Sequence, residues 1–299
     1  MSVISNFPVM PNRIMVVAEY LLGLGAEGGE WEQIQGQLSP LTKAQDDAEE
    51  KGSVMAEYVL REMEKLGMLA RRGATNIALC DELLEASNGG HWDHAVRAYL
   101  FATMTDPALA RVRGQDEVPE ALAWLLAQNP FKPMSWKGEH AQRLKDQLDE
   151  GDDLRKLGGN DQLFQNLVYW SRYLGFAERI GSDAIVPDPT EVVATALPVV
   201  FADAKELAIE AFIQRLGRAI SVLDGGHTRQ QVEARMRDDY LRPDKTLSRS
   251  LSLALTRLQL RGLLKLNKPS DANFFLLDLG KESQPISHVM YCANEKEAA

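Results

Sequence analysis

Apolar and polar residues follow the same order in three stretches of the chain, residues 58–79, 168–187 and 254–277. Each stretch has the spacing of an amphipathic helix, then a glycine, a short apolar run, a polar turn and a second apolar run. Self-similar segments indicate repeated supersecondary units. The pattern therefore predicts three copies of a helix that leads into a β-hairpin.

A glycine ends the predicted helix in each copy, at Gly67, Gly175 and Gly262. Glycine just past a helix adopts the left-handed conformation without steric cost, so it stops the helix cleanly. The return strands are predicted at residues 77–79, 184–186 and 274–277. A helix that leads into a hairpin is the second half of a winged helix-turn-helix, so we expect three winged-helix units.

Further helical patterns surround these three stretches. The first unit has helical patterns at residues 12–22 and 31–38, and the middle unit at 117–128, 135–148 and 160–174. The third unit has them at 204–223, 228–240 and 245–261. An added helix is predicted at 87–105 and a connecting helix at 189–201. The predicted fold is α+β, mainly α, with helical insertions between the winged-helix units. The predicted domains are residues 1–85, 86–202 and 203–280, followed by a flexible tail at 281–299.

Composition places the chain among ordinary globular proteins, with 45% hydrophobic and 25% charged residues in 299. The two cysteines, Cys80 and Cys292, are too few for a disulfide framework, and Cys80 is expected to be a small core residue. No apolar run is long enough to cross a bilayer. A cytoplasmic protein without a membrane partner is expected.

Catalytic and metal-binding motifs are weak. The glycines Gly23, Gly25 and Gly28 match the dinucleotide-binding pattern, but a helix precedes them where that motif needs a strand, which favours an inter-helix turn. His91 and His94 share a helix face without an evident third ligand for a metal. We therefore expect a protein that binds rather than catalyses, without a cofactor or metal.

Positive charge is concentrated near the C-terminus, although the formal net charge of the chain is -10. Residues 204–280 contain 13 Lys plus Arg against 9 Asp plus Glu, a local charge of +4 that leaves -14 for the rest. A nucleic-acid binder needs a basic surface because phosphate contacts dominate affinity. Any such surface here must be local.

The predicted third helix of the third unit carries the candidate DNA-binding residues. In a winged helix this helix enters the major groove, and its first half reads base edges. The candidates off its leucine stripe, expected to face outward, are Lys245, Ser248, Arg249, Ser252 and Thr256, and the hairpin adds Lys265 and Lys268. These side chains suit phosphates and guanine edges, so they predict contact with double-stranded DNA. The first two units are expected to bind proteins.

The opening residues Met1 to Pro8, followed by Pro11, Asn12, Arg13 and a helix, resemble the start of the DpdG family. That family belongs to bacterial gene clusters that install and police 7-deazaguanine bases in DNA. The three-unit layout and the length are also similar, so the resemblance spans the chain. It implies a role beside DNA-modification or restriction enzymes in antiviral defence. The chain also resembles tandem winged-helix subunits of chromosome-organising complexes, which bind flexible partner proteins.

Three functions follow from these observations. The first is a non-catalytic subunit of a DNA-modification or defence assembly, which binds other protein subunits and contacts DNA through its third unit. The second is a scaffold that binds only proteins. The third is a transcription regulator, which would bind its operator tightly and usually as a symmetric dimer.

Overall fold

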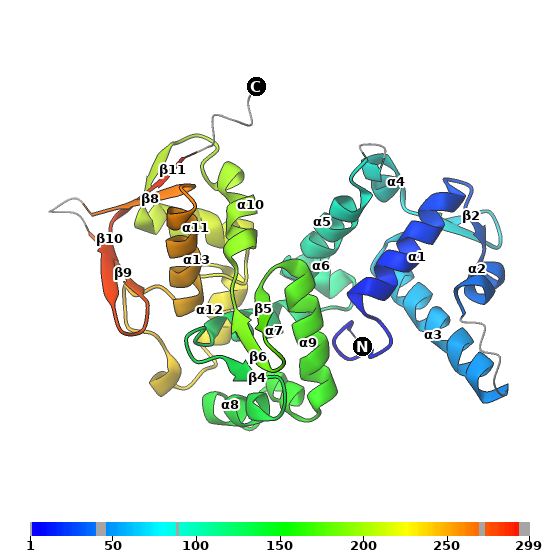
Figure 1. Ribbon diagram of the computed structural model, residues 1–299, viewed down its shortest axis with the longest axis horizontal. Helices are drawn as coiled ribbons and strands as arrows, with labels where there is room; N and C mark the ends of the chain where they lie inside the picture. Colours follow the sequence, from blue (N-terminus) through cyan, green and yellow to red (C-terminus); the bar gives the residue numbers. More distant parts are fainter. Residues whose placement is uncertain (1, 40–45, 88–89, 269–272, 293–299) are drawn as a thin grey trace. The chain divides into compact units, whose positions relative to one another are not determined.

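The computed structural model describes residues 2–39, 46–87, 90–268 and 273–292, with the side chains of residues 46–54 outside that description. The chain divides into two compact units, residues 1–118 and 119–299 (Figure 1). The fold is α+β and mainly helical, as predicted, with small antiparallel sheets. None of the described helices combines the length and the apolar composition that a membrane span needs.

The first unit begins with three helices and a three-stranded sheet. These are α1 (Pro11–Leu24), β1 (Gly29–Glu30), α2 (Trp31–Leu38), α3 (Asp46–Lys65), β2 (Leu69–Arg72) and β3 (Asn76–Leu79). The strands lie in the order β1-β3-β2, all antiparallel. Three added helices follow, α4 (Asp81–Ser87), α5 (Trp92–Thr105) and α6 (Pro107–Val112), of which α5 corresponds to the predicted insertion.

The start of the chain is held inside the first unit, because Val3 and Ile4 are fully buried. The fully buried amide of Gln115 accepts a hydrogen bond from the Val3 backbone N–H (2.8 Å) and donates one to Glu62 (2.6 Å). Ser5 donates to Glu117 at 2.5 Å. The opening residues are therefore part of the folded core.

A second set of elements lies mostly in the second unit. It comprises α7 (Glu117–Ala127), β4 (Met134–Ser135), α8 (Glu139–Gln147), the 3-10 helix η1 (Asp153–Gly158), α9 (Asp161–Leu174), β5 (Ala177–Ile180) and β6 (Ala184–Pro187). The strands lie in the order β4-β6-β5. The three predicted helices of the middle unit are confirmed as α7, α8 and α9.

A third set completes the second unit. It comprises α10 (Thr190–Val200), β7 (Glu206–Ala208), α11 (Ile209–Ala219), α12 (His227–Glu233), the 3-10 helix η2 (Asp238–Tyr240), α13 (Arg249–Leu260), β8 (Leu264–Asn267), β9 (Phe275–Asp278), β10 (Ser283–Ile286) and β11 (His288–Tyr291). One sheet has the order β7-β11-β8, and β9 pairs with β10 in a separate hairpin.

The three sets share one order of elements and one order of strands. In each, a helix precedes a short strand, further helices follow, and the other two strands of the sheet come last, separated in the third set by the β9–β10 hairpin. The first strand always pairs with the last, which lies in the centre of its sheet. We refer to the sets, residues 11–79, 117–187 and 190–291, as the first, second and third repeat.

The predicted glycine stops are confirmed. Gly67, Gly175 and Gly262 follow α3, α9 and α13 with φ of +79°, +91° and +76°. In each case the glycine N–H bonds the carbonyl three residues back, and the next N–H bonds the carbonyl five residues back, over 2.7 to 3.2 Å. This pair of bonds is the Schellman motif, which satisfies carbonyls left free at the end of a helix.

The same return bond closes all three hairpins. The N–H groups of Cys80, Asp188 and Cys292 donate to the carbonyl oxygens of Met68, Phe176 and Leu263, over 2.8, 2.9 and 2.9 Å. The acceptor residue directly follows the glycine in each repeat. The bond therefore identifies β11, just before Cys292, as the return strand of the third repeat.

Two predictions in the third repeat are wrong. Residues 274–277 were expected to form its return strand, and residues 281–299 a flexible tail. Instead β9 pairs with β10 and lies against the segment before α13, where the Leu247 N–H donates to the Leu276 carbonyl at 2.9 Å. β11 then pairs with both β7 and β8, and Val289 on β11 is fully buried, as is Ile286 at the end of β10. Residues 293–299 lie outside the described residues.

The helices at the start of the third repeat also differ from the prediction. Residues 204–223 do not form one helix, because residues 206–208 are recruited as β7 at the edge of the sheet. The predicted connecting helix, α10, packs against both α11 and α13 and is the first helix of the third repeat (Figure 1). The predicted helix at 228–240 is divided into α12 and η2.

The predicted domain boundaries do not coincide with the two compact units. The first unit contains the predicted domain 1–85 together with α4, α5 and α6, and the second unit contains both the second and the third repeats. The division of residues 1–280 into three domains stays a prediction about the modules of the chain.

Candidate nucleic-acid interface and the adjacent pocket

α13 begins at Arg249, later than the predicted start at residue 245. Ser248 is its N-cap, and the Ser248 hydroxyl accepts a hydrogen bond from the Leu251 N–H at 3.3 Å. The segment before the cap runs beside β9, where the Leu276 N–H donates to the Lys245 carbonyl at 2.8 Å. Pairing with β9 therefore replaces the first predicted turn of the helix.

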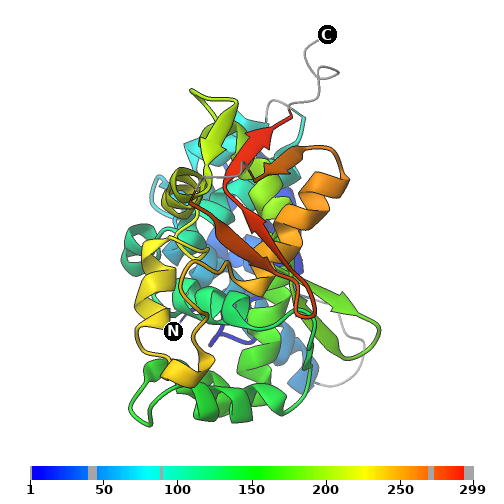
Figure 2. The same ribbon diagram turned by 90° about the vertical axis from the view of Figure 1, so that its left-hand side faces the viewer.

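Two of the predicted DNA-binding residues point into the protein. Ser248 is 5% exposed and Ser252 is 0% exposed, so the expectation that they face outward is wrong. The Ser252 hydroxyl accepts a hydrogen bond from the Asp278 N–H at 3.0 Å. Asp278 ends β9, and the β9–β10 hairpin covers this face of α13 (Figure 2). The sequence pattern did not reveal this second packing surface on the helix.

Two further candidates, Arg249 and Thr256, already interact with other groups of the protein. Arg249 forms an ion pair with Asp278 over 2.8 Å, with 39% of its side chain exposed. The hydroxyl of half-buried Thr256 donates to the Ser252 carbonyl at 2.8 Å. The Arg249 pair joins the start of α13 to β9, whereas the Thr256 bond lies within α13. Of the two side chains, only Arg249 still offers much of its donor group to solvent.

The three candidate lysines are exposed. Lys245 lies in the loop before α13 with φ of +52°, Lys265 lies on β8, and Lys268 follows that strand. The Lys268 ammonium is 5.5 Å from the centre of the Phe274 ring. Among the seven candidates, these lysines are the ones that the fold presents to solvent.

Arginines of the third repeat are largely paired with acidic residues of the chain before β7. Arg235 contacts Glu120 at 2.7 Å and Asp152 at 3.5 Å, and Arg237 contacts Asp149 at 3.5 Å. The other pairs are Arg215–Asp203, Arg257–Asp188 and Arg261–Glu191. The charge asymmetry of the sequence therefore corresponds, in large part, to ion pairs that join segments within the second unit.

A buried charge cluster underlies the start of α13. Asp224 is completely buried and pairs with Arg242, while its Oδ2 accepts the Ser248 N–H at 2.7 Å. Arg229, only 2% exposed, lies 4.0 Å from Asp224 and contacts Glu233 at 2.7 Å. Glu233 also pairs with Arg242 at 3.3 Å. These four residues are the Asp224 cluster.

Electrostatics keep Asp224 ionised. Burial by itself would raise the pKa of the Asp224 carboxyl, but the guanidinium groups of Arg242 and Arg229 and the bonds from Ser248 hold that pKa below its ordinary value. Sequence reasoning missed this cluster. Its one local signal is the i,i+4 spacing of Arg229 and Glu233, which is common on exposed helices and so carries little information.

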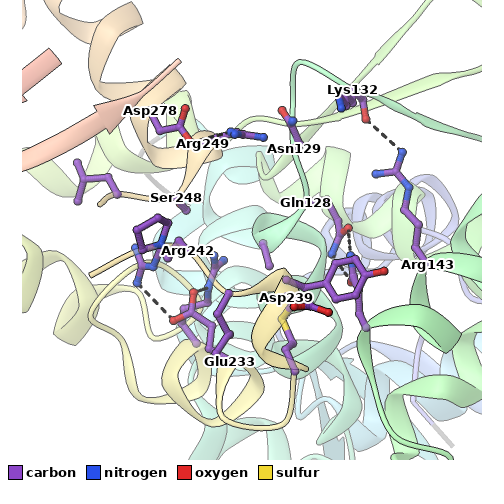
Figure 3. Close-up of a pocket in the computed structure, with 18 residues that line it drawn as sticks. Gln128, Asn129, Lys132, Arg143, Glu233, Asp239, Arg242, Ser248, Arg249 and Asp278 are labelled. Carbon is purple, nitrogen blue, oxygen red and sulfur yellow. Dashed lines mark hydrogen bonds and ion pairs between the residues drawn. The ribbon is translucent and has the colours of Figure 1, made fainter. Parts of the chain in front are cut away.

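A polar pocket lies beside the Asp224 cluster, between the second and third repeats of the second unit (Figure 3). Its volume is about 460 Å³. Five cationic side chains line it, Lys132, Arg143, Arg229, Arg242 and Arg249, together with three carboxylates, Glu233, Asp239 and Asp278. The predicted candidates Ser248 and Arg249 therefore belong to the wall of a pocket.

One side of the pocket is made rigid by paired amides. Gln128 and Gln147 exchange two hydrogen bonds of 3.0 Å each, and the Trp124 indole N–H donates to Gln147 at 2.8 Å. Both glutamines are nearly buried. Fully satisfied buried polar groups of this kind hold their side chains in single orientations.

Other candidates from the sequence lie away from this pocket. Gly25 and Gly28 have φ of +70° and +63° and lie in the turn between α1 and β1, which confirms an inter-helix turn. The rings of His91 and His94 are 5.7 Å apart. Within the described part of the chain, no three His, Cys, Asp or Glu side chains are placed to hold a metal ion.

These features define a mainly helical protein with three repeats, an exposed lysine set and a polar pocket next to the third repeat. A family model described as DpdG-like matches residues 1–272, and the chain belongs to that family. Membership is consistent with a subunit of a DNA-modification cluster. Comparison with curated proteins and with solved structures gave no match.

Proposed function

We propose that this chain is a non-catalytic, winged-helix subunit of a cytoplasmic bacterial assembly for DNA modification or antiviral defence, and that it contacts double-stranded DNA through its third repeat. The observation that carries the proposal is the shared order of elements. A helix, a short strand, further helices and two closing strands, with the first strand paired to the last, is the order of a winged helix. Its threefold occurrence in a DpdG-like chain supports a binding role.

The lysines supply the DNA contact in this proposal. Ser248 and Ser252 are buried, so base reading by the first turn of α13 has little support. Lys245, Lys265 and Lys268 are exposed and suit phosphate oxygens, which position a protein on DNA without reading its sequence. We therefore expect binding that depends steeply on salt and weakly on base sequence.

Charge reversal of the lysines tests this contact. Anisotropy of a labelled duplex, titrated with the full chain over a salt series, should show affinity that falls as salt rises. The variant K245E/K265E/K268E should bind at least about tenfold more weakly, because it places carboxylates opposite phosphates.

The matched control reverses three exposed cations elsewhere in the second unit, as K137E/K145E/R218E. It changes the net charge equally and should retain most of the affinity. Equal weakening in both variants would assign binding to net charge alone and remove the proposed site, as would unchanged affinity in the lysine variant.

A second candidate function is a scaffold that binds only other protein subunits. It is favoured by the internal pairing of the third-repeat arginines and by the net charge of -10. It predicts no duplex binding even at low salt, together with stable co-purification of a partner from native extract. Recovery of only a lone monomer would count against the scaffold.

A further inference from the structure

The pocket beside the Asp224 cluster has no part in the proposed duplex contact, and its lining suits a small ligand. Its volume of about 460 Å³ falls in the range of small-molecule sites, roughly 300–1,000 Å³. Cations outnumber carboxylates along its wall, and apolar side chains such as Met236 and Leu247 complete the lining. A site of this composition fits a ligand with an anionic group and an apolar or aromatic body.

We propose that this pocket binds a phosphorylated ligand of mononucleotide size, with Lys132, Arg143 and Arg249 holding its phosphate group. These three residues come from the loop after α7, from α8 and from the start of α13. Figure 3 shows Arg249 extending toward Asn129 at one edge of the pocket, with Lys132 and Arg143 beyond it. The inference does not rest on the proposed contact with duplex DNA.

The other two arginines that line the pocket are paired within the protein. Arg229 and Arg242 are paired with Asp224 and Glu233, and Arg229 also donates to the Ala123 carbonyl at 3.1 Å. Their charges are therefore neutralised inside the protein, and they form a fixed part of the wall. The cations left for a ligand are Lys132, Arg143 and Arg249.

The existing partners of Arg143 and Arg249 are weak competitors. Arg143 donates to the Lys132 carbonyl at 3.2 Å and lies 3.6 Å from Glu139, whose side chain is 52% exposed. Arg249 pairs with the partly exposed Asp278. Exposed ion pairs contribute little free energy because water screens them. A phosphate dianion that bridges the guanidinium groups forms shorter and stronger charge-assisted bonds, so it can displace these partners.

Neutral donors are also present for the body of the ligand. Asn129 uses its Oδ1 to accept the Phe131 N–H at 2.9 Å, and its Nδ2 group has no hydrogen-bond partner among the described residues. The Gln128–Gln147 pair is satisfied within itself and acts as a rigid wall. The site therefore combines fixed surfaces with a few available donors, as specific pockets do.

Calorimetric titration of the full chain with a deoxynucleoside monophosphate tests the proposal. The monophosphate should bind at least about tenfold more tightly than its matched nucleoside, because the phosphate supplies the charge-assisted bonds. The variant R143A should weaken this binding, whereas R218A, which removes an exposed arginine elsewhere in the unit, should not change it. No heat of binding for any of the four monophosphates, or equal binding of nucleoside and monophosphate, would overturn the proposal.

Substitution of Asp278 should change the affinity for the monophosphate in the opposite direction. The variant D278N removes the carboxylate that competes for Arg249, so monophosphate binding should tighten. The double variant R249A/D278N should bind more weakly than D278N. A D278N protein that binds no more tightly than the unmodified chain would contradict the role of Arg249 as a phosphate ligand.

The source of the nucleotide is decided by a parallel titration. A short single-stranded oligonucleotide with a terminal 5′-phosphate carries the same phosphate monoester as the free monophosphate, and tighter binding of the strand that also depends on Arg143 would identify a nucleotide within DNA. The lysine variant K245E/K265E/K268E should retain monophosphate binding. The monophosphate titration therefore tests the pocket and the duplex titration tests the lysine contact, so either proposal can be contradicted without the other.

Discussion

At single positions the residue type is restricted where the backbone closely approaches another segment. At Gly28, φ is +63° and an added Cβ would lie 2.0 Å from the Ile77 carbonyl oxygen. This contact joins the turn after α1 to β3 of the same sheet. A glycine that resembled part of a nucleotide-binding motif is thus required by packing.

We expect Gly28→Ala to lower the free energy of unfolding by more than about 2 kcal/mol, because it adds left-handed strain to the clash with Ile77. Gly36→Ala is the control, since a Cβ there meets nothing within 4 Å and alanine favours the helix. The control should stabilise the protein by about 0.5–1 kcal/mol. Urea unfolding measures both, and equal stabilities would contradict the structural assignment.

His140 is a second residue whose environment decides its behaviour. Its side chain is completely buried, stacks on Phe164 with ring centres 4.1 Å apart, and lies 3.7 Å from Asp161. Neither ring nitrogen has a hydrogen-bond partner among the residues that the structure describes. Burial lowers the pKa of His140 below 6.5, and Asp161 only partly opposes that shift.

Stability should therefore depend on pH through this residue. The unfolded chain binds a proton at His140 more readily than the folded one, so stability is fully present above about pH 6.5 and falls as the pH drops below that value. His140→Phe should reduce the loss of the urea midpoint between pH 7.5 and 5.5. His94→Phe, at an exposed position, should leave the loss unchanged. The same pH slope in all three proteins would contradict a neutral buried His140.

At the scale of elements, the Asp224 cluster connects the loop after α11, α12 and the start of α13. It does so with opposite charges that are largely removed from water, and the Asp224 Oδ2 is held by both Arg242 and the Ser248 N–H. Breaking such a cluster on one side is costly, because the remaining charges stay buried without compensation.

Asp224→Ala should lower the free energy of unfolding by roughly 3–5 kcal/mol, because Arg229 and Arg242 lose their shared carboxylate. The control is Asp203→Ala, which removes the exposed partner of Arg215 and should scarcely move the urea midpoint. Equal effects of the two substitutions would show that the cluster is no more important than a surface pair.

At the scale of the whole molecule, charge is distributed differently from what the sequence suggests. The local excess of +4 in residues 204–280 predicts a basic surface, but arginines of this segment pair with acids at Glu120, Asp149, Asp152, Asp188 and Glu191. Lysines remain as exposed cations. The local net charge of a sequence therefore describes the charge of the surface only after residues in internal ion pairs are left out of the count.

The sequence alone determined the repeated helix-and-hairpin pattern, the glycine stops and the predominance of helix. These features depend on local physics, because helical spacing, the left-handed freedom of glycine and turn residues act over a few neighbouring positions. The opening residues were also sufficient to suggest the DpdG family, which the match over residues 1–272 shows.

Only the tertiary structure decided which residues are available for binding. Ser248 and Ser252 lie off the leucine stripe of α13, yet both are buried, Ser248 beside Asp224 and Ser252 against β9. Contacts between distant segments leave no local periodicity, so the sequence pattern could not show this. The return strand of the third repeat was misplaced for the same reason, since only long-range pairing shows that β11 joins β8 while β9 pairs with β10. The pocket and the Asp224 cluster likewise consist of residues brought together by folding, so sequence spacing could not reveal them.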